Sequence, residues 1–245
     1  RQGIDHALFL FVDKEKVLVE EKTEKEKLEV IRKEKQGMVN TLSKKERDIQ
    51  KQIAATKKQQ EQLNRMIKSA IEAEIRAAET ASKKEKSTST KKAGTSMPMT
   101  PEAAALSSSF AGNKGKLPWP VEKGFISESF GTHKHPIAEK VLVENFGVDI
   151  KTNSNAPARS VFDGVVSSVF SAGMGQTVMI NHGKFFTVYS KLGSVSVKAG
   201  DRVKTKQHIG VVGNIDGETT INFQIWKVGA NNKSARVNPE DWIAR

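Results

Sequence analysis

The feature that most constrains this chain is the stretch from Asp13 to Ala81, which contains no proline and a single glycine, Gly37. Its apolar residues recur at mixed spacings of three and four and fall on one a/d register: Leu28, Ile31, Met38, Leu42, Ile49, Leu63, Met66, Ala70, Ala73 and Ala77. A helix of about 65 residues is about 100 Å long and needs a partner helix for stability. We therefore predict an α-helical coiled coil over residues 1–81, with the partner supplied by upstream sequence or by another chain.

Polar residues interrupt this seam, so the predicted coiled coil is imperfect. The interruptions are Lys35, Lys45, Gln52, Thr56 and Gln59. The chain does not open with Met and has no apolar run of about 18 residues, which is the length that spans a bilayer. We expect that the sequence is a fragment and that any signal peptide preceded Arg1.

The formal net charge of +12 suggests nucleic-acid binding, but the arrangement of the charges argues against it. Acidic and basic residues alternate closely along residues 14–35, which is typical of a solvated, ion-paired helix face. The chain has no cysteine, which excludes a cysteine nucleophile and a cysteine metal site. We expect no nucleic-acid partner.

The pattern changes after residue 81. Residues 82–99 offer almost no large apolar side chain and are predicted to form a flexible linker. Residues 100–112 read as a short amphipathic helix, with Thr100 as N-cap, Pro101 at the first helical position, and Ala103, Leu106 and Phe110 on one face.

From about residue 116 onward, short β-type runs alternate with turn signals such as Asn181-His182-Gly183 and Ala199-Gly200-Asp201. This spacing predicts a compact domain over residues 116–245 that is mostly antiparallel β-sheet. The predicted fold class is therefore a long helical coiled coil followed by a mostly antiparallel β-sandwich domain.

Ordered short motifs run through the predicted β domain. They are Leu117-Pro118-Trp119-Pro120, Phe130-Gly131, His135-Pro136, Gly147-Val148-Asp149-Ile150, Ala156-Pro157, Asp163-Gly164-Val165-Val166, Asn181-His182-Gly183, Thr187-Val188-Tyr189, Val197-Lys198-Ala199-Gly200-Asp201, Ile209-Gly210 and Asn238-Pro239. In this order they resemble the LytM-type, or lysostaphin-like, family of zinc metallopeptidases, which cut peptidoglycan cross-bridges.

The resemblance implies a zinc site whose ligands are mostly missing from this chain. In active members, zinc is held by the His and Asp of an H-x-G-x-D pattern and by the second His of an H-x-H pattern. Here the first pattern reads Asn145-Phe146-Gly147-Val148-Asp149 and the second reads Thr220-Ile221-Asn222. Of the three ligands only Asp149 remains, whereas a catalytic zinc site needs three protein ligands of the His, carboxylate or thiolate type.

The helper histidines of the family are also absent. The family's Y-x-H-L pattern reads Tyr189-Ser190-Lys191-Leu192, and the first His of H-x-H is Thr220. A lysine at this position repels a metal cation and can pair with Asp149. We therefore expect no catalytic residue, no metal and no cofactor. The expected remnant is a partner-binding groove lined by Asn145, Asp149, Lys191, Thr220 and Asn222.

Other histidines are weak candidates for a replacement site. His133 and His135 lie in a predicted loop before Asp149, and His182 and His208 are expected to be surface or turn residues. A compensating metal site of His133, His135 and Asp149 is the less favoured alternative.

A coiled coil, a linker, a lone helix and a domain without its metal ligands together resemble the EnvC-like murein hydrolase activators. The resemblance implies a non-enzyme that activates a peptidoglycan amidase through the vacated groove during cell-wall remodelling and daughter-cell separation. It also implies a periplasmic or extracytoplasmic location at the division site, an FtsEX-type membrane complex bound through the coiled coil, and possible contact with peptidoglycan. The helix carrying Ala103, Leu106 and Phe110 is expected to cover the groove and inhibit the domain, or else to cap the domain permanently.

Three alternatives remain open. The domain could be a passive peptidoglycan-binding scaffold, or an active endopeptidase with an atypical metal site. A biotinyl or lipoyl carrier domain is a more distant alternative, suggested by residues 197–203 and by Lys184 after the Asn-His-Gly turn.

Overall fold

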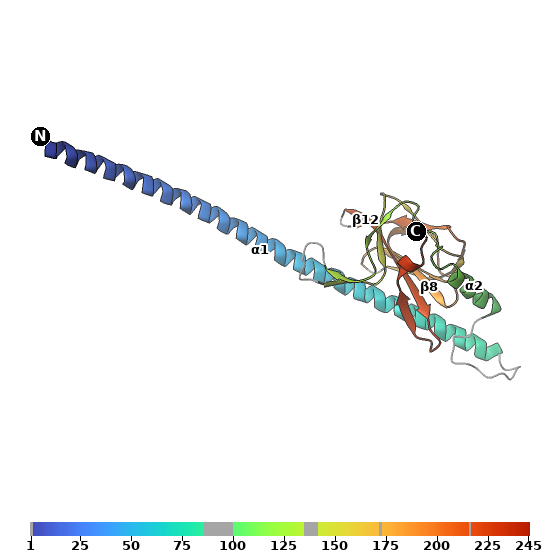
Figure 1. Ribbon diagram of the computed structural model, residues 1–245. Helices are drawn as coiled ribbons and strands as arrows, with labels where there is room; N and C mark the ends of the chain where they lie inside the picture. Colours follow the sequence, from blue (N-terminus) through green and yellow to red (C-terminus); the bar gives the residue numbers. More distant parts are fainter. Residues whose placement is uncertain (1, 86–99, 135–141, 172, 216) are drawn as a thin grey trace. The chain divides into compact units, whose positions relative to one another are not determined.

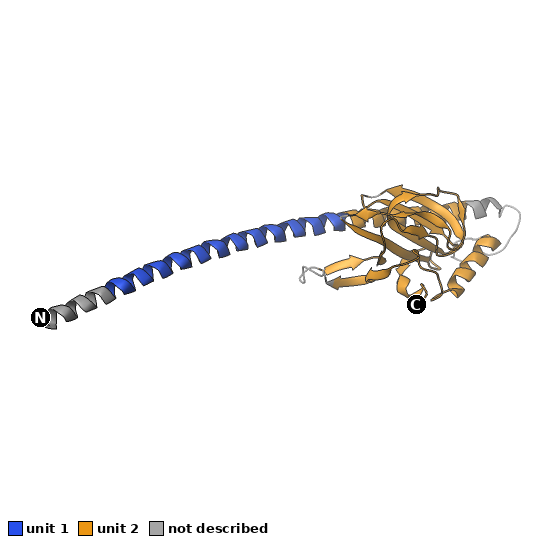
Figure 2. Ribbon diagram, turned by 90° about the horizontal axis from the view of Figure 1, so that it is seen from above, with its two compact units in different colours: residues 1–58 blue, residues 59–245 orange. Residues whose placement is uncertain are grey.

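A computed structural model describes residues 2–85, 100–134, 142–171, 173–215 and 217–245 (Figure 1). The chain divides into two compact units, residues 1–58 and residues 59–245 (Figure 2). The helices and strands, in chain order, are α1 (Gln2–Glu85), α2 (Pro101–Gly112), β1 (Phe125–Glu128), β2 (Gly131–Lys134), β3 (Leu142–Asn145), β4 (Val148–Lys151), β5 (Pro157–Arg159), β6 (Gly164–Ser171), β7 (Gln176–Asn181), β8 (Phe185–Val195), β9 (Arg202–Val203), β10 (His208–Val212), β11 (Asn214–Ile215), β12 (Glu218–Val228), β13 (Ser234–Val237) and the 3-10 helix η2 (Pro239–Asp241).

The long helix predicted from the sequence is confirmed as α1, and it continues to Glu85, beyond the predicted end at residue 81. Residues 86–99 of the predicted linker lie outside the described residues. In the first unit the seam residues Leu28, Met38 and Leu42 are 61–65% exposed. Pairing of this part of α1 with another helix therefore stays a prediction. In the part of the chain that the structure describes, no helix is long and apolar enough to cross a membrane.

The predicted antiparallel β domain is also confirmed. Its main sheet has the strand order β1-β4-β12-β8-β7-β6-β9, and every ladder between the described strands is antiparallel. Strands β2 and β3 form a separate hairpin, which pairs Gly131 with Asn145. The two longest strands, β8 and β12, lie side by side near the centre, and most residues of each strand are buried.

Side chains alternate along each strand, so successive residues lie on opposite faces of the sheet. The two faces pack against different apolar clusters. On β12, Ile221, Phe223 and Ile225 point into the main core. The intervening residues Asn222 and Trp226 point to the opposite face, which we call the site face. Trp226 there belongs to a second apolar cluster, formed with residues of β7, β8 and α1.

The second cluster contains part of α1. Leu63, Ile67, Ile71 and Ile75 are at most 5% exposed and pack against the site face. They follow one another at i+4 spacing, so they form one stripe along the helix. We call residues 59–79 of α1 the covering segment. For this part of α1 the sheet supplies the apolar partner that the sequence analysis assigned to a second helix.

Helix α2 has the predicted start, with the Thr100 hydroxyl accepting a hydrogen bond from the Ala103 amide at 3.2 Å. Of the two positions expected for this helix, over the groove or as a permanent cap, the structure shows the second. Phe110 is fully buried in the main core and stacks on His182 at 4.9 Å and on Phe185 at 4.8 Å between ring centroids. Since none of these partners lies in the expected groove, α2 is an integral cap of the β domain in this structure.

His182 lies in the predicted turn, between β7 and β8, but is buried there and not at the surface. Its Nδ1 lies 2.6 Å from the carbonyl oxygen of Asp163, and its Nε2 lies 2.8 Å from the hydroxyl of Thr187. Burial lowers the pKa of His182 to about 4. The imidazole is therefore neutral at neutral pH and acts as a structural group beneath Phe110.

We predict that Phe110→Ala lowers the free energy of unfolding of the β domain by about 3–5 kcal/mol, because it removes a fully buried ring. Urea unfolding of the full chain, followed by near-ultraviolet circular dichroism, measures this change. Leu106→Ala, at a partly exposed position of the same helix, is the matched control and should cost far less. Equal small losses for both variants would contradict the capping role.

We also predict a pH dependence of stability that comes from His182. Its folded-state pKa of about 4 lies below the ordinary value of 6.5, so the unfolded chain binds the proton more readily. Stability from this group is present above about pH 6.5 and is lost as the pH falls toward 4, by roughly 3 kcal/mol in total. Urea midpoints of wild type and His182→Gln, measured from pH 4 to pH 7, should converge at the acidic end. Parallel profiles would rule out this contribution.

Candidate functional site

The structure brings the predicted groove residues together at one end of the site face. Asn145 ends β3, Asp149 lies on β4, and Thr220 and Asn222 lie on β12. All four are buried, with exposures of 2–7%. The register pairs Asn222 with Asp149 on one side and with Ser190 on the other, which places Lys191 of β8 next to them.

The approach of β4 to β12 depends on a glycine. A Cβ atom built on Gly147 would lie 2.2 Å from the carbonyl oxygen of Phe223 and 2.6 Å from the side chain of Gln224. Any other residue would force the strands apart. This close contact explains the glycine between Asn145 and Asp149, and it fixes the distance of both side chains from Asn222.

A row of hydrogen bonds joins these side chains. The Asn222 amide donates to Asp149 Oδ1 at 2.6 Å and to Asn145 Oδ1 at 3.1 Å. The Gln224 amide donates to Asn222 Oδ1 at 2.9 Å, and the Trp226 indole N–H donates to Gln224 Oε1 at 3.0 Å. The row therefore runs from the groove residues to Trp226 in the second apolar cluster. Asn222 is hydrogen-bonded to both Asn145 and Asp149, which fixes the three side chains relative to one another.

Lys191 supplies the positive charge of the site. Its Nζ lies 2.6 Å from Asp149 Oδ2, and both side chains are largely withdrawn from water. The backbone of Lys191 has a φ of 67°, a left-handed conformation that is uncommon for a residue with a side chain. Such strain persists only where the surrounding fold over-determines it, and it clusters at functional positions.

These side chains do not form the ligand set of a catalytic zinc ion. Asn145, Asp149 and Asn222 offer one carboxylate and two neutral amides, whereas catalytic zinc is held by three ligands of the His, carboxylate or thiolate type. The ammonium group of Lys191 meets the one carboxylate and would repel a cation there. Across the described parts of the chain, no cluster of three or more His, Cys, Asp or Glu is arranged to hold a metal.

Of the alternative metal ligands, the structure places His133 beside Glu128, with Nε2 2.6 Å from Oε1. His135 lies outside the described residues. His133 pairs with Val143 across the β2–β3 hairpin, on a different strand from Asp149. A metal site of His133, His135 and Asp149 therefore stays without support from the described residues.

The covering segment reaches the edges of the groove. The Gln60 side-chain amide donates to the carbonyl oxygen of Glu144 at 3.1 Å, next to Asn145. On the other side, Gln59 lies against Gly173, in the turn between β6 and β7. At its far end the segment is held through Glu74, whose carboxylate accepts from Ser167 at 2.5 Å. A helix of the same unit thus lies across the site face.

Sequence reasoning missed several residues of this face. Gln224 and Trp226 continue the alternation that begins at Thr220 and Asn222, so a period-two reading of β12 would have found them. Ile67, Ile71 and Ile75 were left off the heptad register, although their i+4 spacing marks a separate stripe. The predicted regulatory residues Ala103, Leu106 and Phe110 lie on α2, which contacts the Asn181–Gly183 turn instead of the groove.

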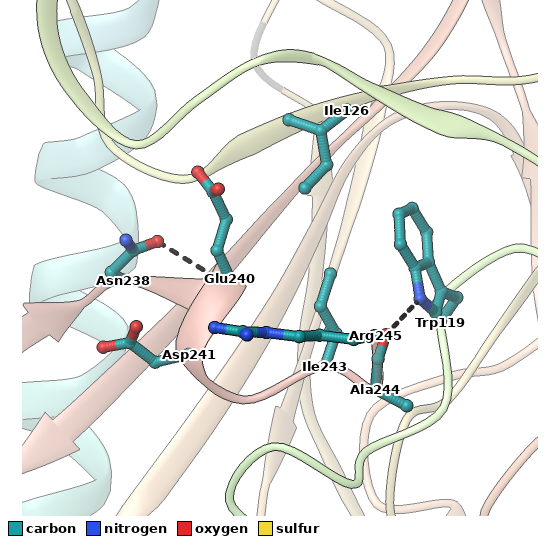
Figure 3. Close-up of a pocket in the computed structure, with 8 residues that line it drawn as sticks. All are labelled: Trp119, Ile126, Asn238, Glu240, Asp241, Ile243, Ala244 and Arg245. Carbon is teal, nitrogen blue, oxygen red and sulfur yellow. Dashed lines mark hydrogen bonds between the residues drawn. The ribbon is translucent and has the colours of Figure 1, made fainter.

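A separate cavity of about 270 Å³ lies near the C-terminal residues (Figure 3). Its lining includes Trp119, Ile126, Glu240 and Ile243, and the Trp119 indole donates to the carbonyl oxygen of Ala244 at 2.8 Å. None of the groove residues lines it. The cluster of predicted groove residues and this cavity are therefore distinct features of the domain.

Residues 143–239 match the sequence profile of Peptidase family M23, and this range includes every predicted groove residue. We refer to the β domain, of which residues 143–239 match this profile, as the M23 domain. A protein of Buchnera aphidicola subsp. Baizongia pistaciae, named an uncharacterized metalloprotease, is 31% identical over 116 residues, covering 45% of this chain and 30% of that protein. The cell division protein DipM of Caulobacter vibrioides is 29% identical over 120 residues, covering 47% of this chain and 19% of DipM.

Among solved structures, Csd3 of Helicobacter pylori is similar to the M23 domain, with a TM-score of 0.43 and 29% identity. The match covers 53% of this chain and 35% of Csd3. The chain thus spans less than a third of each curated relative described above.

We predict that Asn145→His and Asn222→His, combined with Lys191→His, create zinc affinity in the M23 domain. The changes supply two imidazole ligands beside Asp149 and remove the repelling ammonium. Isothermal titration with zinc should show one site per chain, and adding Asp149→Ala to the triple variant is the control that should abolish it. A folded triple variant that binds no zinc would show that the groove geometry differs from a metal site.

Proposed function

We propose that this chain is a non-catalytic activator of a peptidoglycan amidase in cell-wall remodelling and daughter-cell separation. The observation that carries the proposal is the chemistry of the groove, where Lys191 and two asparagines surround Asp149. A site that cannot supply three metal ligands is unsuited to hydrolysis by metal-bound water. The M23 domain still keeps a row of buried, mutually hydrogen-bonded polar side chains at this point, which suits binding better than catalysis.

The comparisons support the cellular setting of this proposal. The M23 family match indicates a peptidase scaffold, and one relative carries the name of a cell division protein. We place the protein in the periplasm or another extracytoplasmic part of the envelope, at the division site. The first unit of α1, with its exposed apolar residues, would connect it to an FtsEX-type membrane complex.

We further propose that the covering segment, rather than α2, keeps the groove closed. Leu63, Ile67, Ile71 and Ile75 occupy the site face, and Gln60 reaches the strand that carries Asn145. Each such buried apolar side chain contributes about 1.5–3 kcal/mol to the closed state. A partner that packs its own apolar side chains on the same face recovers most of the free energy lost when the covering segment detaches. The partner can therefore replace the covering segment.

The direct test is a dye-release assay on labelled peptidoglycan with candidate amidases, with and without the full chain. The proposal requires no release by the chain alone and stimulated release when an amidase is present. Release by the chain alone would favour an endopeptidase. Binding to sacculi without stimulation of any amidase would favour a passive peptidoglycan-binding scaffold.

We predict that Ile67→Asp combined with Ile71→Asp increases amidase stimulation several-fold, because two charges at buried positions detach the covering segment from the site face. The matched control is Ala73→Asp combined with Ala77→Asp, which adds the same charges at exposed positions of α1. Stimulation by this control should equal that of wild type. Loss of stimulation by a folded Ile67/Ile71 variant would mean that the segment assists the partner instead of excluding it.

A further inference from the structure

We propose that Arg236 recognises a carboxylate on the protein segment that replaces the covering segment. This inference rests on the proposed function, because it concerns the partner of the same face. Arg236 lies on β13 opposite Trp226, at the border between the groove and the second apolar cluster.

The guanidinium of Arg236 is held by aromatic rings. Its Cζ lies 3.7 Å from the ring centroid of Phe146 and 5.5 Å from that of Trp226. Phe146 directly follows the groove residue Asn145. A guanidinium stacked on aromatic faces keeps its N–H groups in one plane, which prepares it for two parallel hydrogen bonds to a carboxylate.

Part of this guanidinium lacks a partner. Arg236 Nη1 is buried and makes no hydrogen bond to the described residues. Burial lowers the pKa of Arg236, and the negative charge of Glu144 opposes that shift. Glu144 therefore interacts with the guanidinium electrostatically but makes no hydrogen bond to Nη1. A buried N–H without an acceptor destabilises the structure, and a carboxylate is the acceptor that best fits a guanidinium.

Where the covering segment meets Glu144 it carries the amide side chains of Gln60 and Asn64. Gln60 donates to the carbonyl oxygen of Glu144, and Asn64 follows one helical turn later on the same side of α1. The Asn64 side-chain nitrogen is likewise buried with no hydrogen-bond partner among the described residues. Gln60 thus reaches Glu144, and Phe146, which stacks on Arg236, lies two residues further along the chain. The proposal therefore requires that a carboxylate at position 64 reaches Arg236 and accepts from its guanidinium.

The unsatisfied Nη1 of Arg236 favours replacement of the covering segment by another protein segment. The covering segment fills the apolar part of the site face but leaves Arg236 unsatisfied. A competing segment with an aspartate or glutamate beside its apolar side chains accepts a hydrogen bond from Arg236. It therefore binds more tightly at this position than α1 does. Arg236 thus distinguishes acidic partners from segments that are merely apolar.

The first experiment uses the full chain and no partner. Asn64→Asp should slow hydrogen exchange of the amides of residues 63–75 about tenfold, and Arg236→Met should abolish that gain. Asn64→Leu is the matched control of similar size; its effect should be the same with and without Arg236→Met. Equal effects of Asn64→Asp in both backgrounds would overturn the proposal.

The second experiment uses the Ile67→Asp, Ile71→Asp chain, in which the site face is uncovered, and a purified candidate amidase. Adding Arg236→Lys, which keeps the charge but loses the planar fork, should weaken amidase binding about tenfold. Unchanged binding would contradict the carboxylate recognition. If no candidate amidase binds the uncovered chain, the proposed function fails, and the exchange measurements on Asn64 and Arg236 still decide the present inference.

Discussion

The alternation of side chains along β12 is the constraint on which the rest of the domain depends. Its odd-numbered residues, such as Phe223, build the main core, and its even-numbered residues build the site face. Because Asn222, Gln224 and Trp226 are hydrogen-bonded in series, the groove and the apolar surface under α1 form one continuous structure. A shift of one residue in register would bury the polar row in the core and expose the core residues.

Much of the fold could be predicted from local signals. The absence of proline predicted α1, and period-two runs with turn residues predicted the antiparallel sheet. Over the covering segment the heptad register included Leu63, Met66 and Ala70 of the second cluster but not Ile67, Ile71 and Ile75, for a physical reason. A helix that packs on a sheet needs a stripe at i+4 spacing, as at Ile67 and Ile71, whereas the heptad rule assumes a second helix as the partner. Periodicity shows that a face is apolar but cannot show what covers it.

The same reasoning explains which parts of the site were predictable. Asn145, Asp149, Lys191 and Asn222 could be found from the family resemblance, since each stands at a motif position. Arg236 could not, because its role depends on the pairing of β13 with β12 and on the ring of Phe146. The docking of α2 was also beyond the sequence, because the site face and the main core both offer apolar surface to Phe110.

Two groups of the chain itself occupy the site face of the M23 domain. The ammonium of Lys191 meets Asp149 where the family resemblance places a metal ion, and the covering segment lies on the face that a partner would occupy in the proposed function. The two differ in how they are held. Lys191 lies on β8 and its Nζ is 2.6 Å from Asp149 Oδ2, with both side chains largely withdrawn from water. The covering segment leaves polar atoms of Asn64 and Arg236 unsatisfied, and its contacts are those of one helix on a sheet. The Lys191–Asp149 pair is thus a contact between neighbouring strands of one sheet, whereas the helix contact has the features of one that a better-matched partner can replace in the proposed function.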